Sequence, residues 1–207
     1  MRKAIKVGSI TVERAAKAAG GKIYNFGVPE NTELSGVCTD SREAEEGDLF
    51  VAIPGENTDG HKYIAQAVKN GALCVIGERL PENAFEMGSF AFILCERSID
   101  ALCAIAYNMK KSLSFKTVAI TGSVGKTTTK EIITAVLGEK YRVHKTDGNH
   151  NTDIGISLCL LEMPPETEIA VLEMGMSGFG EIARMSDIAE PDVSVITNIG
   201  SSHIEML

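Results

Sequence analysis

The first hundred residues alternate short apolar runs with amphipathic segments. The run "GDLFVAIPG" ends in a Pro-Gly turn signal, which predicts a strand followed by a loop. In the segment after it, Ile64, Ala67 and Val68 share one helical face, and Gly71 suits the C-terminal cap of that helix. Residues 73–76 then resume an apolar strand. This order predicts a strand–helix–strand unit.

A further apolar run at 90–94 predicts another strand, and a helix should follow it. Ser98 stands where it could cap the start of that helix. Four apolar residues after it recur at helical spacing and should face the core: Ile99, Leu102, Cys103 and Ala106. The polar, lysine-bearing stretch at 110–116 then separates this unit from the rest. We place a domain boundary there, which gives domains 1–113 and 114–207.

The second unit has the clearer pattern. Apolar runs over 117–121, 169–173 and 193–198 predict buried strands, and a Gly-rich turn after the first leads into a helix that runs through Leu137. The apolar stripe expected on this helix is Ile132, Ile133, Val136 and Leu137. Continuous Val/Ile runs separated by helical stretches indicate a parallel sheet covered on both faces. The predicted fold class is therefore α/β, with a small N-terminal α/β domain followed by a parallel-sheet domain.

The composition argues against two classes of partner. The 207 residues carry a formal net charge of −8, and an acidic surface repels phosphate polymers and anionic membranes. Near the start, Glu13, Arg14 and Lys17 interrupt the apolar run that a signal peptide needs. We therefore expect no nucleic-acid partner and no membrane insertion.

The five cysteines are odd in number and widely spaced, and none forms a C-x-x-C pair. That pattern fits neither a disulfide framework nor a zinc site, so we expect small buried residues in a reducing cytoplasm.

The segment "TVAITGSVGKTTTKE" carries the strongest chemistry in the chain. Gly122 and Gly125 allow the backbone to approach a phosphate closely, and the helix start that follows adds its dipole. Lys126 would then sit as a point charge on the β and γ phosphates, and the Thr127 hydroxyl would bind magnesium. Ile120 stands where the usual longer motif has its first glycine, so the loop is the shorter T-G-x-x-G-K-T form. A nucleotide site is predicted here.

Polar residues also follow the other two predicted strands of this sheet, where ligands bind in α/β folds. Glu173 closes one strand and could reach a magnesium ion; the competing interpretation is a strand-end carboxylate in solvent or at a helix start. His203 follows the other; alone it would be a surface histidine, and its position makes it a candidate ligand. Between them, Asn149, Asn151 and Thr152 crowd a turn before a helical segment. Loop and cap chemistry would explain them, and a substrate or nucleotide contact would explain them equally well.

Taken together, these segments resemble the Mur ligase family. "TGSVGKTTTKE", "GNHNTDIG", "LEMGMSGFGEI" and "PDVSVITNIGSSHIE" occur in the family's order, and "TDSREAEEGDLFVAIPGENTDGHKYIAQAVKNGA" resembles its domain for the UDP-linked substrate. The resemblance spans nearly the whole chain. "EMG" followed by "GEI" resembles the branch that adds D-alanyl-D-alanine.

The resemblance implies roles for individual residues. Lys126, Glu173 and His203 would be catalytic, with Thr127 and Glu173 on one magnesium ion and His203 near a second. The residues implied for ATP are Thr121, Gly122, Ser123, Val124, Gly125, Lys126, Thr127, Thr128 and Asn151. Those implied for the UDP-muramoyl substrate are Asp40, Ser41, Arg42, Asn149 and Thr152. For Asp40 and Arg42 a structural ion pair in a turn is the competing interpretation.

The implied reaction joins D-alanyl-D-alanine to UDP-N-acetylmuramoyl tripeptide, with ATP and Mg²⁺, through an acyl phosphate. Such chemistry needs alignment and charge neutralisation more than a protein nucleophile. We expect a monomer in the cytoplasm. The alternatives are another Mur-type ligase that adds a single amino acid, a regulatory P-loop NTPase, and a non-catalytic binding module. Because the chain stops just beyond His203, we also expect the central domain to be incomplete and ligation by this chain alone to be slow.

Overall fold

A computed structural model describes residues 10–55, 58–148 and 150–200. The chain divides into two compact units, Met1–Ile105 and Ala106–Leu207. This division falls inside one helix, whereas the predicted boundary between 113 and 114 lies just after that helix ends. Each unit has its own sheet. Among the described residues, no helix is both long enough and apolar enough to cross a membrane.

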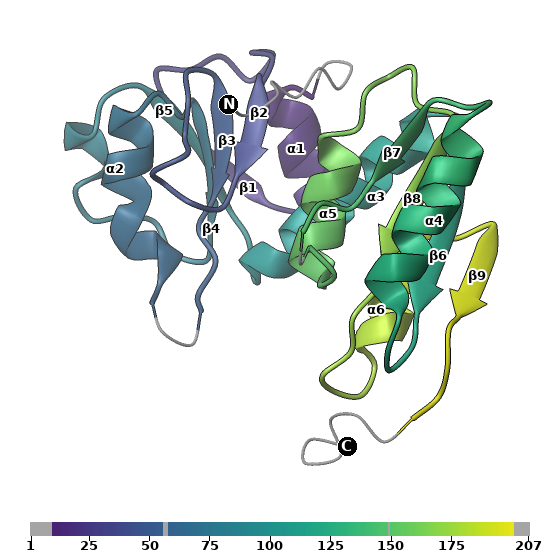
Figure 1. Ribbon diagram of the computed structural model, residues 1–207. Helices are drawn as coiled ribbons and strands as arrows, with labels where there is room; N and C mark the ends of the chain where they lie inside the picture. Colours follow the sequence, from purple (N-terminus) through teal and green to yellow (C-terminus); the bar gives the residue numbers. More distant parts are fainter. Residues whose placement is uncertain (1–9, 56–57, 149, 201–207) are drawn as a thin grey trace. The chain divides into compact units, whose positions relative to one another are not determined.

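The first unit is built around a five-stranded sheet in the order β1-β5-β4-β3-β2 (Figure 1). Its strands are β1 (Lys22–Phe26), β2 (Gly36–Cys38), β3 (Asp48–Val51), β4 (Cys74–Gly77) and β5 (Phe90–Leu94). Its helical segments are α1 (Val12–Ala19), η1 (Gly60–Tyr63), α2 (Ile64–Lys69), η2 (Ala84–Glu86) and the start of α3 (Ser98–Ser112). Only β1 runs antiparallel, pairing with β5 so that Lys22 lies opposite Leu94. The predicted strands of this unit are confirmed to within one or two residues.

Alternation along each strand divides the core of this unit between the two faces of the sheet. Phe50, Val75 and Phe92 point to the face where α2 packs, and they form one buried cluster with Ile64 and Ala67 of that helix. Figure 1 shows α1 on the opposite side of the sheet from α2. The helix predicted from the spacing of Ile64 and Ala67 therefore buries the expected face.

The start of α3 differs from the prediction. Ser98 is the first residue of the helix, and its hydroxyl is buried without a hydrogen-bond partner. The acceptor at this helix start is instead the Glu78 carboxylate, which follows β4 and accepts from the Ser98 backbone N–H at 2.9 Å. The local sequence signalled a cap, but a side chain distant in sequence supplies it. The predicted core residues Leu102, Cys103 and Ala106 are buried, and Ile99 is half-buried.

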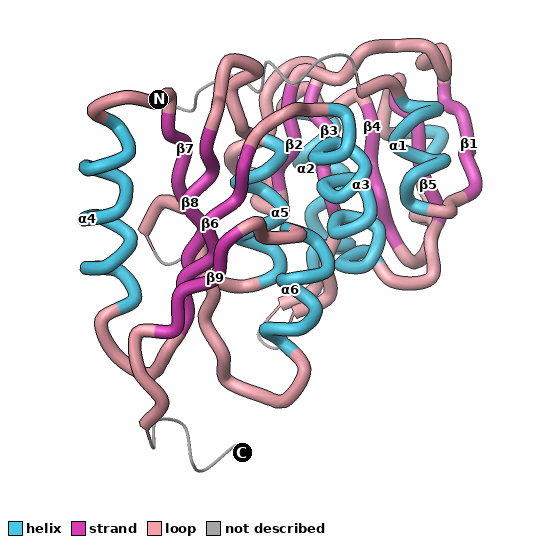
Figure 2. Tube along the Cα trace, turned by 90° about the vertical axis from the view of Figure 1, so that its right-hand side faces the viewer, coloured by secondary structure: helices cyan, strands magenta, loops and turns pink. Residues whose placement is uncertain are grey.

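The second unit holds a fully parallel four-stranded sheet in the order β7-β8-β6-β9. Its strands are β6 (Lys116–Thr121), β7 (Val143–Lys145), β8 (Ile169–Glu173) and β9 (Val193–Ile196), and its helices are α4 (Lys126–Gly138), α5 (Asp153–Leu161) and α6 (Glu181–Ala189). Figure 2 shows α4 on one face of the sheet and α5 and α6 on the other. The predicted α/β class and doubly covered parallel sheet are confirmed.

The predicted apolar stripe of α4 is partly wrong. Ile132 and Val136 are 60% and 67% exposed, whereas Ile133 and Leu137 are half-buried and face the sheet. The buried face of α4 includes Lys130, and a residue two positions along a helix is turned by about 160° from it, so Ile132 points away from the sheet. The residue of α4 that is fully buried is a lysine, Lys130.

Candidate active site

The predicted phosphate loop lies between the end of β6 and the start of α4. Gly125 is the N-cap of α4 at φ 84°, a left-handed conformation that favours glycine. The first hydrogen bond of the helix runs from the Thr129 N–H to the Gly125 carbonyl, at 2.9 Å. The N–H groups of residues 126–128 therefore precede the helical ladder and, with the helix dipole, form an anion-binding end.

Gly122 is required by close approach from β9. Its φ of 136° is unfavourable for other residues, and an added Cβ would overlap the Thr197 hydroxyl and lie 3.0 Å from the Asn198 nitrogen. Glycine at this position lets the loop pass directly beside Thr197 and Asn198, which follow β9. The sequence alone explained the glycine by close approach of phosphate, and packing against these two residues is a second reason for it.

The residues after β9 hold the loop in place. Asn198 accepts from the Val124 N–H at 3.0 Å through its side chain, and Thr197 donates from its hydroxyl to the Val124 carbonyl at 2.6 Å. The Ser123 hydroxyl donates to the Gly200 carbonyl at 3.0 Å and accepts from its N–H at 2.9 Å. Sequence reasoning did not single out Thr197 or Asn198. Their position after a strand that neighbours β6 was the available signal.

Lys126 bends back onto its own loop. Its ammonium group donates to the Gly122 carbonyl at 2.6 Å. The ammonium group is thus held next to the N-terminus of α4. A phosphate bound there would compete with the Gly122 carbonyl for it. The phosphate contact of Lys126 stays a prediction.

Thr127 and Glu173, the two residues predicted for one magnesium ion, lie in direct contact. Strands β6 and β8 are neighbours in register, with Ile120 opposite Glu173, so the end of β8 faces the loop after β6. The Thr127 hydroxyl donates to Glu173 Oε1 at 3.1 Å. Glu173 is only 4% exposed, and its Oε2 is buried with no hydrogen-bond partner. A solvated strand-end carboxylate, the competing interpretation, does not describe this environment.

This donor set fits magnesium bound together with a nucleotide. Mg²⁺ prefers hard oxygen ligands and is usually held by one or two carboxylates plus phosphate oxygens and water. Within residues 10–55, 58–148 and 150–200, no group of three or more His, Cys, Asp or Glu side chains could hold a metal by itself. His203, predicted for a second ion, lies outside the described residues.

The polar segment before α5 approaches the same edge of the sheet. Thr152 is the N-cap of α5, and its hydroxyl accepts from the Gly155 N–H at 3.2 Å, as the cap interpretation required. The Asn151 carbonyl accepts from the Gly175 N–H at 2.7 Å, just after β8. Asn149 lies outside the described residues.

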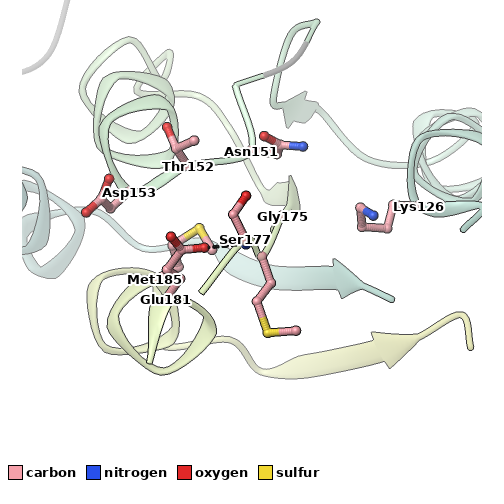
Figure 3. Close-up of a pocket in the computed structure, with 9 residues that line it drawn as sticks. Lys126, Asn151, Thr152, Asp153, Gly175, Ser177, Glu181 and Met185 are labelled. Atoms are coloured by element: carbon pink, nitrogen blue, oxygen red, sulfur yellow. Dashed lines mark hydrogen bonds between the residues drawn. The ribbon is translucent and has the colours of Figure 1, made fainter. Parts of the chain in front are cut away.

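A cavity of about 290 Å³ lies beside Lys126 and this segment (Figure 3). It is lined by Lys126, Asn151, Thr152, Asp153, Gly175, Met176, Ser177, Glu181 and Met185. In the view of Figure 3, Lys126 lies on one side of the cavity and the carboxylates of Asp153 and Glu181 lie on the other. Glu181 is held in place by the Ser177 N–H, which donates to its Oε2 at 2.6 Å. Asp153 is already paired with Arg184 at 3.0 Å, so the charges that the cavity offers to a ligand are those of Lys126 and Glu181.

The residues predicted to bind the UDP-linked substrate belong to the first unit. Arg42 donates to Asp40 from its backbone N–H at 2.9 Å and from its guanidinium at 2.5 to 3.1 Å. These hydrogen bonds, led by the side-chain ones, hold the pKa of Asp40 below its usual value. Ser41 is buried, and its carbonyl accepts from the Asn70 amide at 2.8 Å. The structure thus contains the predicted turn ion pair, while substrate binding by these residues stays a prediction.

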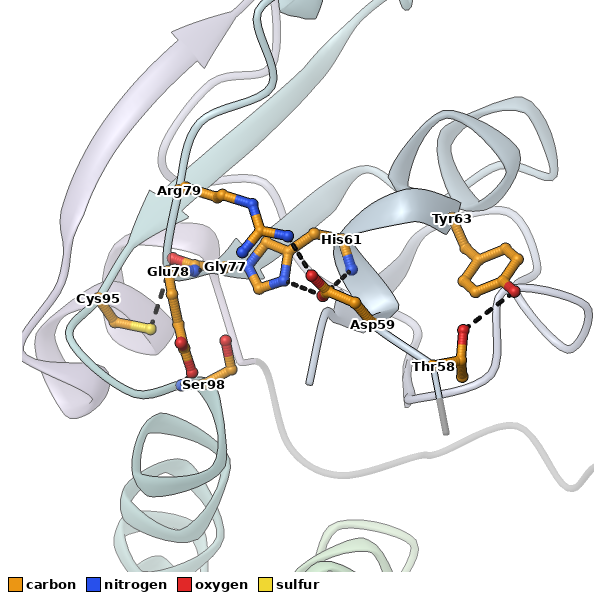
Figure 4. Close-up of polar contacts among 9 residues, drawn as sticks. All are labelled: Thr58, Asp59, His61, Tyr63, Gly77, Glu78, Arg79, Cys95 and Ser98. Atoms are coloured by element: carbon orange, nitrogen blue, oxygen red, sulfur yellow. Dashed lines mark hydrogen bonds and ion pairs between the residues drawn. The ribbon is translucent and has the colours of Figure 1, made fainter. Parts of the chain in front are cut away.

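The "DGH" segment, to which the sequence alone gave no individual role, forms a hydrogen-bond network (Figure 4). The His61 side chain is 4% exposed; its Nδ1 lies 2.7 Å from Asp59 Oδ1, and its Nε2 lies 2.8 Å from the Glu78 N–H. A backbone N–H can only donate, so Nε2 is the acceptor and Nδ1 carries the proton given to Asp59. Asp59 also pairs with Arg79. The network fastens the 58–61 turn to the end of β4.

Charge pairing in this network overrides the effect of burial on Asp59. Burial raises the pKa of Asp59, but hydrogen bonds from Arg79 and from the backbone and ring of His61 bring it well below its usual value. Asp59 is thus ionised at neutral pH and holds both partners.

The loop between β6 and α4, at the edge of a parallel sheet covered on both faces, is the arrangement of P-loop α/β domains. The Mur ligase middle domain matches residues 120–207, and the Mur ligase family catalytic domain matches residues 33–96. The chain belongs to the Mur ligase family and comprises its N-terminal and middle domains.

Within that family the chain is similar to UDP-N-acetylmuramoyl-tripeptide–D-alanyl-D-alanine ligases. It is 46% identical over 197 residues to the UDP-N-acetylmuramoyl-tripeptide–D-alanyl-D-alanine ligase of Bacillus subtilis, covering 95% of this chain and 42% of that protein. Its fold matches MurF from Acinetobacter baumannii with a TM-score of 0.88 and 35% identity, over 96% of this chain and 43% of the other. MurF from Thermotoga maritima in complex with ADP matches with a TM-score of 0.74 and 43% identity, over 82% and 38% of the two chains. The chain spans less than half the length of these relatives.

Proposed function

We propose that this chain supplies the nucleotide-binding and UDP-substrate-binding parts of an ATP-dependent ligase that joins D-alanyl-D-alanine to UDP-N-acetylmuramoyl tripeptide in cell-wall synthesis. The observation that carries the proposal is the Thr127–Glu173 contact beside the anion-binding end of α4. The contact supports the proposal because a hydroxyl and a carboxylate are oxygen ligands of the kind that magnesium takes together with ATP. The similarity to D-alanyl-D-alanine ligases supports the choice of substrates.

In the proposed site, each group of this chain has a limited task. The N–H groups of residues 126–128 and the Lys126 ammonium bind phosphate oxygens, with the loop residues Thr121 to Thr128 around them and Asn151 nearby. Thr127 and Glu173 hold magnesium, which neutralises charge on the phosphates when it is bound. The tripeptide carboxylate, aligned with the γ-phosphate, would attack its phosphorus and release ADP, which gives an acyl phosphate. The dipeptide amine would then attack the acyl carbon, displace phosphate and lose a proton to form the amide. His203 is proposed for a second ion.

The two predicted domains divide the substrates. Residues 114–207 bind ATP, with Asn149 and Thr152 next to the reacting end of the muramoyl peptide. Residues 1–113 bind the UDP-linked end through the turn that holds Asp40, Ser41 and Arg42. We propose a cytoplasmic monomer.

The proposal is tested by calorimetry with ATP and Mg²⁺, with UDP-N-acetylmuramoyl tripeptide, and with D-alanyl-D-alanine, each alone. Binding of both ATP and the tripeptide supports it. Binding of ATP with no affinity for the muramoyl substrate would indicate a regulatory P-loop NTPase. Binding of the tripeptide without ATP would indicate a binding module, and stronger binding of a UDP-muramoyl dipeptide would indicate a ligase that adds a single amino acid.

A further inference from the structure

Lys130 is buried, although the apolar pattern of α4 does not predict a buried lysine at this position. It is 1% exposed, whereas Ile132 and Val136 of the same helix are mostly exposed. Burying an ammonium group is unfavourable unless opposite charge and hydrogen-bond acceptors surround it. The position of Lys130 therefore needs an explanation from its partners.

Its partners belong to the two segments that flank the proposed magnesium site. The ammonium group donates to the Thr146 carbonyl at 2.9 Å and lies 3.5 Å from Glu173 Oε2. It also lies 3.6 Å from Glu131 Oε1, but Glu131 is half-exposed and is paired with Lys145 at the surface. Glu173 is thus the buried charge that Lys130 faces.

The Glu173 carboxylate is held from two sides. Its Oε1 accepts from Thr127, while its Oε2 has no hydrogen bond and faces Lys130. The Glu173 backbone N–H donates to the Thr146 hydroxyl at 3.0 Å, and Thr146 is itself fully buried. Lys130 therefore contacts the carboxylate oxygen that Thr127 does not, while Thr146 holds the backbone of the same residue.

We propose that Lys130 is a positioning residue for magnesium binding: it fixes the orientation of the Glu173 carboxylate and anchors the chain at Thr146, five residues before Asn151. One ammonium group would then join three parts of the site, namely α4, the segment after β7 and the end of β8. Partners of this kind orient metal ligands from behind without touching the ion. The inference rests on the proposed function, because it assumes that Glu173 binds magnesium with the nucleotide.

Two effects of Lys130 oppose one another. Its positive charge repels a cation held by Glu173, while its orientation of the carboxylate favours that cation. The ammonium group of Lys130 lies next to Oε2, whereas Oε1 accepts a hydrogen bond from Thr127, in the first turn at the phosphate-binding end of α4. Oε1 is therefore the oxygen on the nucleotide side. Loss of an orienting partner behind a metal ligand typically weakens metal affinity about 10- to 100-fold. We infer that orientation dominates.

The test is calorimetric titration of ADP at increasing Mg²⁺, with wild type, Lys130→Met and the control Lys145→Met. Methionine retains most of the apolar stem of the lysine. Lys130→Met is expected to lower the Mg²⁺ affinity of the ADP complex about 10- to 100-fold and to leave ADP binding without Mg²⁺ within about twofold of wild type. The control Lys145→Met also removes one positive charge, from the ion pair with Glu131. Its Mg²⁺ affinity in the ADP complex should equal that of wild type.

A double-mutant cycle separates positioning from general support of the fold. In a Glu173→Gln background, Lys130→Met should cause no further loss of the Mg²⁺ response. An equal loss of ADP binding with and without Mg²⁺, or a stronger Mg²⁺ response in Lys130→Met, would overturn the inference. If Lys130→Met does not fold, Lys130→Gln, which keeps a donor for Thr146, is measured with the same expectation. Absence of any Mg²⁺ response in wild type would overturn the proposed function as well.

Discussion

The Thr127 hydroxyl donates a hydrogen bond to Glu173 Oε1 at 3.1 Å, which joins the first turn of α4 to the end of β8 across 46 residues of sequence. The contact exists because β6 and β8 are parallel neighbours whose carboxyl ends meet at one edge of the sheet. It brings a hydroxyl and a carboxylate, both hard oxygen donors, to the end of the helix that attracts phosphate.

Removal of the Lys126 ammonium should weaken nucleotide binding. Lys126→Ala is expected to cost about 1.5 to 3 kcal/mol of MgATP binding free energy, the usual loss for one charge-assisted hydrogen bond. Calorimetric titration with MgATP measures this loss, once a thermal melt has shown that the variant unfolds at the same temperature as wild type. Unchanged affinity would mean that the lysine keeps its hydrogen bond to the Gly122 carbonyl and does not contact phosphate.

A methyl group at position 122 should displace the loop from β9. Gly122→Ala would place a Cβ against the Thr197 hydroxyl and force alanine to a φ of 136°. We expect a loss of about 1 to 3 kcal/mol in unfolding free energy and weaker nucleotide binding. Gly138→Ala is the control, because nothing lies within 4 Å of its added Cβ and alanine favours a helix. Equal urea midpoints for the two variants would contradict the close approach.

Removal of the His61 ring should destabilise the first unit. His61→Ala leaves the Glu78 N–H without its acceptor and removes a partner of Asp59. Loss of a buried hydrogen-bond partner costs about 1 to 3 kcal/mol, so the unfolding free energy from urea denaturation should fall by that amount. Lys62→Ala, at the exposed neighbouring position, serves as control. If the unfolding free energies of His61→Ala and Lys62→Ala agree within error, water replaces the hydrogen bonds of the ring and the prediction is wrong.

The low pKa of Asp59 should make stability depend on pH on the acid side. The pKa of Asp59 is lower in the folded state than in the unfolded chain, where it is near 3.8. Its ionised form therefore stabilises the fold at pH values above 3.8, and this contribution is lost as the pH falls below 3.8 toward the folded-state pKa. Unfolding free energy should therefore decline from pH 5 toward pH 2, and Asp59→Asn should flatten that decline. Glu30→Gln, at an exposed site, controls for the change in net charge. Parallel pH curves for the wild type and Asp59→Asn would contradict the assignment.

The sequence determined the parts of this protein that depend on local order. Glycines, a lysine and a threonine between an apolar run and a helix start specify an anion-binding loop by themselves, because backbone freedom and helix polarity act within a few residues. Periodicity likewise predicted β6, β8 and the helix at Ile64. It could not find β1, which pairs antiparallel at the edge of its sheet through contacts with β5 about 70 residues away.

The tertiary structure decided which side chains reach the site and which faces are buried. The sequence placed an apolar stripe on Ile132 and Val136, whereas the position of α4 on the sheet turned Lys130 inward toward Glu173 and left those two residues exposed. Strand order brought Thr197 and Asn198 onto the phosphate loop, and Glu78 rather than Ser98 caps α3. Each of these contacts joins residues 20 to 75 positions apart, and such pairings depend on strand register and helix rotation, which no local pattern encodes.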